Sequence, residues 1–219
     1  MEFSPVLTMI FGALLIGIGG HLSAITPKLW QGMIIKSNPR ILAVILGLLG
    51  IALVGGGGTL TTYSWNEIDR ADEKKAIIIS VANEWYYNQY LYKKSTLFTE
   101  DPVSLRSYNF YPRFSNEKIR IALMSSLFSL SDSLDHSLLS ILAKMERIIY
   151  KTNNRLQVTD DYSKTTTDRD SVADRRSYAL KSTGLELFTN NQEILGEFIK
   201  SSYPWALPDS AFVAMLEEM

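Results

Sequence analysis

The sequence of 219 residues contains no cysteine, which excludes disulfide bonds and thiol nucleophiles. It also has no excess of basic charge, because 22 Lys and Arg stand against 23 Asp and Glu. Because the chain has no excess of positive charge to bind backbone phosphates, nucleic-acid binding is disfavoured. A nucleophile elbow, a phosphate-binding glycine loop and a zincin helix are all missing as well. We therefore expect no catalytic residues, no bound metal and no cofactor.

Charge is scarce in the first 61 positions, where the charged residues are Glu2, Lys28, Lys36 and Arg40. Residues 5–25 form an uncharged run that, as a helix, would be about 31 Å long and would cross a bilayer. A cleaved signal peptide has a basic start and a shorter apolar core, neither of which is found here. This pattern predicts a retained transmembrane span.

A second apolar run begins at Ile41, but up to Val54 it would cover only about 21 Å. Including the tetraglycine run and its neighbours up to Thr61 restores a full span, so we predict a second crossing over 41–61. Tyr63 and Trp65 then lie where interfacial aromatics are expected. The glycines are tolerated in a transmembrane helix and allow backbones to approach closely.

The short connection between the spans predicts an antiparallel transmembrane hairpin over residues 1–62. Pairing about the midpoint of the connection puts Gly19 opposite Gly47. We interpret the glycines as a packing surface within the hairpin, with a groove for a second membrane subunit as the alternative. The predicted packing residues are Gly17, Gly19, Gly20, Gly55, Gly56, Gly57 and Gly58.

Basic residues in the connection predict the orientation of the chain. Lys28, Lys36 and Arg40 occur there without an acidic residue, which favours a cytoplasmic loop. Both termini and the C-terminal domain would then lie outside the cytoplasm, at an inner or plasma membrane. Arg70, Lys74 and Lys75 oppose this assignment, although they begin about nine residues beyond the second span.

Residues 63–219 show helical periodicity and no strand-like alternation, which predicts an all-α, up-down soluble bundle of four to five helices. One long helix is expected over 66–97, almost continuous with the second span. A continuous apolar stripe predicts another over 116–150, formed by Leu123, Leu127, Leu130, Leu134, Leu138, Ile141, Met145 and Ile148. A polar loop is expected over 151–170, followed by helices over 170–188, 190–201 and 208–218.

The most unusual soluble segment is NEWYYNQYLY, residues 83–92. Core packing against two neighbouring helices explains most of its aromatic residues. The alternative is a binding surface for a partner or a ligand, since Tyr and Trp combine large contact area with polar handles. The candidate binding residues are Trp85, Tyr86, Tyr87 and Tyr90.

The remaining polar candidates have simpler interpretations than catalysis. His21 lies near the cytoplasmic end of the first span, where hydrogen bonding at the interface accounts for it. Asp132 and His136 are one helical turn apart and could share a metal, but His136 falls on the face opposite the apolar stripe. Glu84 has no second acid placed near it by helical spacing. We read all four as structural or solvated residues.

These observations favour a non-enzymatic, membrane-anchored protein that presents its extracytoplasmic bundle to a partner, as an accessory or regulatory subunit. Its expected partners are the lipid bilayer and either another protein or a second copy of the chain. The alternative is a small-ligand-binding or sensing module with a pocket between bundle helices near Trp85, Tyr86 and Tyr90. An enzyme that uses Glu84 or the Asp132/His136 pair is a third reading.

Overall fold

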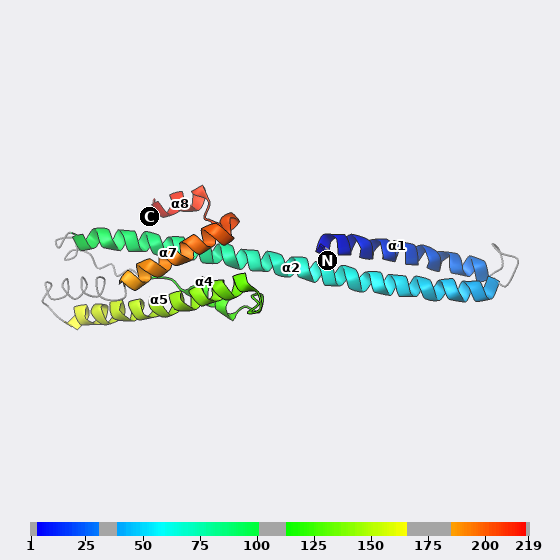
Figure 1. The fold of residues 1–219 in the computed structure, drawn as a ribbon, viewed down its shortest axis with the longest axis horizontal. Helices are drawn as coiled ribbons and strands as arrows, with labels where there is room; N and C mark the ends of the chain where they lie inside the picture. The colour runs from blue at the N-terminus through cyan, green and yellow to red at the C-terminus, as the bar shows by residue number, and fades with distance from the viewer. Residues whose placement is uncertain (1–3, 31–38, 101–112, 166–184, 218–219) are drawn as a thin grey trace. The chain divides into compact units, whose positions relative to one another are not determined.

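The computed structural model describes residues 4–30, 39–100, 113–165 and 185–217, and every regular element in these ranges is helical. This confirms the all-α prediction for the described part of the chain. In order along the chain, the elements are α1 (Pro5–Trp30), α2 (Pro39–Glu100), α4 (Glu117–Met124), α5 (Ser133–Thr165), α7 (Leu185–Ser202), the 3₁₀ turn η1 (Pro204–Ala206) and α8 (Ser210–Glu217) (Figure 1).

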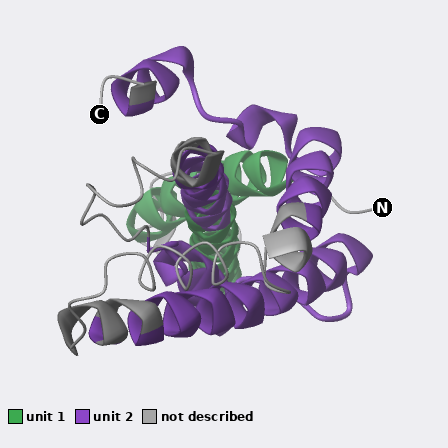
Figure 2. Ribbon diagram, turned by 90° about the vertical axis from the view of Figure 1, so that its left-hand side faces the viewer, with its two compact units in different colours: residues 1–73 green, residues 74–219 purple. Residues whose placement is uncertain are grey.

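The chain divides into two compact units, Met1–Glu73 and Lys74–Met219 (Figure 2). Helix α2 is unbroken from Pro39 to Glu100 and therefore contributes to both. Unit 1 contains two helices, within Pro5–Lys28 and from Ile41 onward, that are long and apolar enough to cross a membrane.

In unit 1, α1 lies beside the first part of α2, and glycines mark the points where the two backbones approach (Figure 1). A Cβ placed on Gly12 would lie 2.8 Å from the carbonyl oxygen of Gly57. A Cβ on Gly19 would lie 2.6 Å from the carbonyl oxygen of Gly50. Only glycine fits such contacts without displacement, because any side chain would overlap the facing backbone.

The predicted register, with Gly19 opposite Gly47, is wrong, because Gly19 lies against Gly50. The cause lies at the connection between the helices. Helix α1 continues to Trp30, past the expected end at residue 25, and α2 begins at Pro39 rather than at residue 41. The midpoint of the turn is therefore displaced toward the C-terminus, and every facing pair is displaced with it.

The core of unit 2 is built by α2, α4, α5 and α7 together with Phe114, Phe128, Tyr203 and Ala206. Helix α5 supplies its longest buried row, at three- and four-residue steps, because that spacing places side chains on one face. Helix α7 packs against α5 through Leu195 and Ile199. The buried row on α5 consists of Leu138, Leu142, Met145, Ile149, Thr152 and Leu156.

The continuous helix predicted over 116–150 is wrong: α4 ends at Met124 and α5 begins at Ser133. Ser125 adopts an extended conformation, and its hydroxyl oxygen accepts a hydrogen bond from the backbone N–H of Leu127. Serine side chains compete with the helix for backbone groups in this way. Two members of the predicted apolar stripe, Leu130 and Leu134, are consequently exposed.

The loop predicted over 151–170 is also wrong in its first part, because α5 continues to Thr165. Burial of Thr152 and Leu156 extends the packed face beyond Tyr150, and tertiary contacts then override the polar composition. Most of the helix predicted over 170–188 lies outside the described residues. Helix α7 begins at Leu185, earlier than expected, and α8 closely matches the predicted terminal helix.

Candidate functional site

A polar cluster on α2 holds the segment that leads into α4. The side-chain amide of Asn88 donates to the carbonyl oxygen of Ser115 (2.7 Å) and accepts from the N–H of Ser115 (2.8 Å). Asn153 on α5 pairs with Phe114 in the same manner, at 2.7 and 3.0 Å. Two asparagines from different helices thus satisfy the main chain of two adjacent residues, as neighbouring strands would in a sheet.

Glu84, one helical turn before Asn88, caps the N-terminus of α4. Its carboxylate accepts hydrogen bonds from the backbone N–H groups of Lys118 (3.1 Å) and Ile119 (2.9 Å) and from the hydroxyl of Ser115. The cap residue Asn116 makes no such side-chain bond, so a carboxylate from another helix takes over its role. Glu84 is 6% exposed, and its oxygens are occupied by these donors.

Trp85 is buried against α7, in contact with Gly196. Its indole N–H donates to the carbonyl oxygen of Gln192 over 2.8 Å. A Cβ on Gly196 would lie only 2.4 Å from the indole ring, so the ring occupies the space that any side chain there would need. Trp85 therefore fastens α2 to α7 by packing and by one buried hydrogen bond.

The three tyrosines of the aromatic segment, Tyr86, Tyr87 and Tyr90, are half-buried and pack against the core. Tyr86 makes edge-to-face contacts with Trp85 at 6.2 Å and with Phe212 of α8 at 6.5 Å between ring centroids. The structure thus accounts for these residues by packing, while their binding role stays a prediction.

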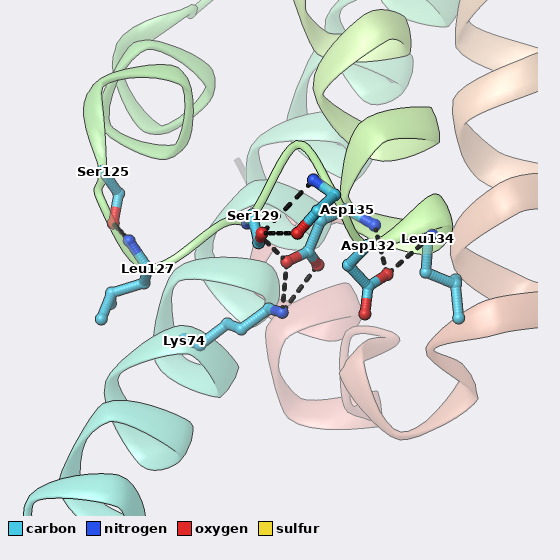
Figure 3. A network of polar contacts seen from close by, with 8 residues as sticks. Lys74, Ser125, Leu127, Ser129, Asp132, Leu134 and Asp135 are labelled. Carbon is cyan, nitrogen blue, oxygen red and sulfur yellow. Dashed lines mark hydrogen bonds and ion pairs between the residues drawn. The ribbon is translucent and has the colours of Figure 1, made fainter.

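A second polar cluster lies where Lys74 of α2 meets the turn between α4 and α5 (Figure 3). The Lys74 ammonium lies 2.6 and 2.7 Å from the two carboxylate oxygens of Asp135, and 5.4 Å from the centre of the Phe128 ring. Asp135 is buried and also accepts the N–H of Ser129 at 2.9 Å. These bonds satisfy a buried charge, which would otherwise be costly.

Asp132 caps the N-terminus of α5. Its Oδ1 accepts the N–H groups of Leu134 (2.8 Å) and Asp135 (3.1 Å), as expected for an N-cap (Figure 3). His136 is exposed, and so is His21 in unit 1. Among the described residues, no three His, Asp or Glu side chains are grouped as a metal would require.

Tyr203, after α7, is influenced by the same acidic residues. Burial raises the pKa of its hydroxyl above the ordinary value of 10.0, and the negative charges of Asp135 and then Asp132 raise it further. Its ring packs edge-to-face against Phe198 and Trp205. This part of unit 2 thus keeps a neutral phenol beside a paired carboxylate.

The predicted packing glycines differ in their surroundings. Gly19 and Gly57 contact the facing helix, together with Gly12 and Gly50, which the sequence analysis did not select. The other five have open space where a Cβ would lie, namely Gly17, Gly20, Gly55, Gly56 and Gly58.

Sequence reasoning did not find Asn88, Asn153 or the capping role of Glu84. One available signal was the i, i+4 spacing of Glu84 and Asn88 on a face that also carries apolar residues, since polar groups on such a face need partners. No protein family, no curated protein and no solved structure matches this chain.

Proposed function

We propose that the protein is an integral membrane protein in which α1 and the apolar part of α2 form a transmembrane hairpin. On this proposal, unit 2 is a helical bundle outside the cytoplasm, which the hairpin presents to a protein partner. The protein would act as a non-enzymatic accessory or regulatory subunit.

The observation that carries this proposal is the exposure of the apolar side chains in α1 and in the first part of α2. In the most apolar 18-residue stretch of each helix, only 11% and 17%, respectively, is buried, whereas the core helix of a soluble protein is mostly buried. At about 1 kcal/mol for each half-exposed aliphatic side chain removed from water, lipid would stabilise this surface by on the order of 10 kcal/mol. The exposed residues are Val6, Leu7, Ile10, Phe11, Leu14, Ile18, Ile41, Val44, Ile45, Leu48, Leu49, Ile51 and Val54.

The hydroxyl groups along these helices support the same conclusion. Thr26 donates to the carbonyl of Leu22 at 2.9 Å, and Thr61 donates to that of Gly57 at 2.8 Å. Thr59 and Ser64 likewise donate to carbonyls within α2, and Thr8 donates to the carbonyl of Ser4, just before α1. These bonds satisfy the five hydroxyl protons without water, which is compatible with a lipid environment.

Membrane insertion can be tested with the full chain, which has no cysteine of its own. Leu48→Cys and Val158→Cys place single thiols at exposed positions of α2 and α5. In intact cells we expect a membrane-impermeant thiol reagent to label position 158 and not position 48. Labelling of position 48 in intact membranes would rule out the hairpin, and labelling of position 158 only after lysis would place unit 2 in the cytoplasm.

The partner role is tested by crosslinking in native membranes followed by mass spectrometry. We expect a reproducible set of crosslinks from exposed residues of unit 2 to one protein, including a second copy of the chain. A chain that is inserted correctly but yields no reproducible crosslink would contradict the accessory-subunit proposal.

A small-ligand-binding module is the second candidate function, and one observation favours it. Gln192, whose backbone carbonyl accepts the indole N–H of Trp85, has a buried side-chain amide, and neither the nitrogen nor the oxygen of this amide has a partner among the described residues. A polar ligand could satisfy it. Native mass spectrometry of protein purified from its own membranes would then detect a bound molecule that the Gln192→Leu variant lacks. Identical spectra for the two proteins would eliminate this candidate.

A further inference from the structure

Helices α5 and α7 leave an open groove of about 730 Å³ along their shared surface. Its apolar lining comes from Ile141 of α5 and from Ile194 and Phe198 of α7. Ile194 is 52% exposed, although Leu195 and Ile199, on the adjacent face of the same helix, are packed into the core. At the groove, α7 thus has one exposed apolar side chain, Ile194, next to the half-buried Phe198.

The α7 side of the groove is acidic. Glu193 and Glu197 both line it, four residues apart on the exposed surface of the helix. Glu197 lies 3.0 Å from the ammonium of Lys200, whereas Glu193 has no ion-pair partner among the described residues. Like charges at this spacing repel, so an opposing basic surface would stabilise the helix.

The α5 side continues into a row of basic residues. Lys144 follows Ile141 by one helical turn, and Arg147 and Lys151 continue at steps of three and four, so they share one exposed face. In the part of the chain that the structure describes, none of these three forms an ion pair. Ile141 is the one α5 residue in the described lining of the groove, and the basic residues extend the exposed face of α5 beyond it. On this side of unit 2, α5 therefore carries positive charge and α7 carries negative charge.

We propose that this face binds the same face of a second copy of this chain. Lys144, Arg147 and Lys151 of each copy would lie against Glu193 and Glu197 of the other, and the two grooves would cover each other. A partner of one charge sign would match only one side of the groove, whereas a second copy matches both. The inference rests on the proposed function, because it names the partner to which unit 2 is presented.

The charge pattern also selects the symmetry of the pair. A two-fold axis parallel to α5 and α7 sets α5 of one copy opposite α7 of the other, basic against acidic. An axis perpendicular to the helices in the plane of contact would set α5 against α5 and bring like charges together. We therefore expect the parallel arrangement, in which equivalent helices of the two copies point the same way.

The test is a charge exchange in the full chain, read as protein mass by light scattering in detergent. The first variant, Glu193→Lys/Glu197→Lys, makes both sides of the groove basic, and the second, Lys144→Glu/Arg147→Glu, makes both acidic. We expect wild type to have twice the mass of the 24.7 kDa chain. For each variant alone, the dissociation constant of the dimer should be at least about tenfold higher than for wild type. Mixed in equal amounts, they should pair again.

Glu117→Lys/Arg120→Glu is the matched control, with charge reversals on α4, and it should leave the mass of wild type unchanged. A monomeric wild type, variants that remain dimeric, or a mixture that fails to re-pair would each overturn the proposal. Flotation of the same proteins with vesicles distinguishes a failure of the dimer proposal from a failure of the membrane-hairpin proposal. Variants that float but do not pair oppose only the dimer, whereas a wild type that does not float opposes the membrane hairpin.

Discussion

Asn88 and Asn153 bind two adjacent residues of one segment, and each does so through both polar atoms of its side-chain amide. They stand on α2 and α5, so the segment at Phe114 and Ser115 is held by two helices that are far apart in sequence. With Glu84 at the start of α4, these residues fix where that helix begins. Among the buried polar side chains that the structure describes in unit 2, Glu84 and Asn88 belong to this cluster and Asp135 to the cluster at Lys74.

Two substitutions of buried amides should have opposite results. Asn88→Leu leaves the N–H and carbonyl of Ser115 unpaired and should destabilise unit 2 by about 2–4 kcal/mol. Gln192→Leu removes an amide that has no partner among the described residues, and it should be neutral or stabilising by up to about 1 kcal/mol. Chemical denaturation of the full chain in detergent measures both. Equal destabilisation by the two changes would show that Gln192 is satisfied.

Replacing Glu84 tests the cap of α4. Glu84→Ala should cost about 3 kcal/mol, because two backbone donors and a hydroxyl lose a charged acceptor. Glu84→Gln keeps an acceptor oxygen and should cost about half as much. The exposed Glu117→Gln is the control and should change the unfolding free energy by less than about 0.5 kcal/mol. A Glu84→Ala protein as stable as the control would contradict the capping role.

Gly196→Ala should destabilise the contact between α2 and α7 by more than about 2 kcal/mol, because the new methyl group would overlap the Trp85 ring. The two positions should also couple in a double-mutant cycle. In a Trp85→Phe background the smaller ring leaves room, so the added cost of Gly196→Ala should fall below about 1 kcal/mol. If the destabilisations by Gly196→Ala and Trp85→Phe are additive, the indole ring of Trp85 is not what opposes a side chain at position 196.

The two kinds of glycine in unit 1 should respond differently to the same change. Gly57→Leu would drive a side chain into the backbone at Gly12 and should separate α1 from α2. Gly56→Leu points into open space and should be tolerated. Thermal loss of helicity in detergent measures the difference, and we expect a lower midpoint for position 57 alone. A lower midpoint for position 56 would instead indicate that a further helix covers that side.

Because of Tyr203, we expect the unfolding free energy to fall at alkaline pH. Its pKa is raised in the folded state, so the folded protein holds the phenolic proton more tightly than the unfolded chain does. The resulting stabilisation is complete below pH 10 and is lost as the pH rises from 10 through the folded-state pKa. Tyr203→Phe should make the unfolding free energy less dependent on pH in that window. Parallel pH profiles for wild type and variant would contradict this assignment.

The order of the helices and the two apolar stretches could be predicted from sequence, because they depend on residues close together along the chain. Apolar composition over about 20 residues identifies α1 and the first part of α2, and three- and four-residue spacing identifies the packed face of α5. The α5 prediction failed at its ends. Ser125 and Asp132 bind nearby backbone groups and interrupt the helix, whereas burial of Thr152 and Leu156 prolongs it.

Contacts between residues distant in sequence were decided by the tertiary structure. Gly19 meets Gly50 because α1 ends at Trp30 and α2 begins at Pro39, and Trp85 is buried because Gly196 of α7 leaves space for its ring. Spacing along one helix cannot reveal which residue of another helix fills a gap or accepts a bond. Local composition was enough to predict the two long apolar helices and most of the helical segments of unit 2, but not where those segments end. Only the folded chain decided the register of α1 on α2, the cap of α4 and the groove between α5 and α7.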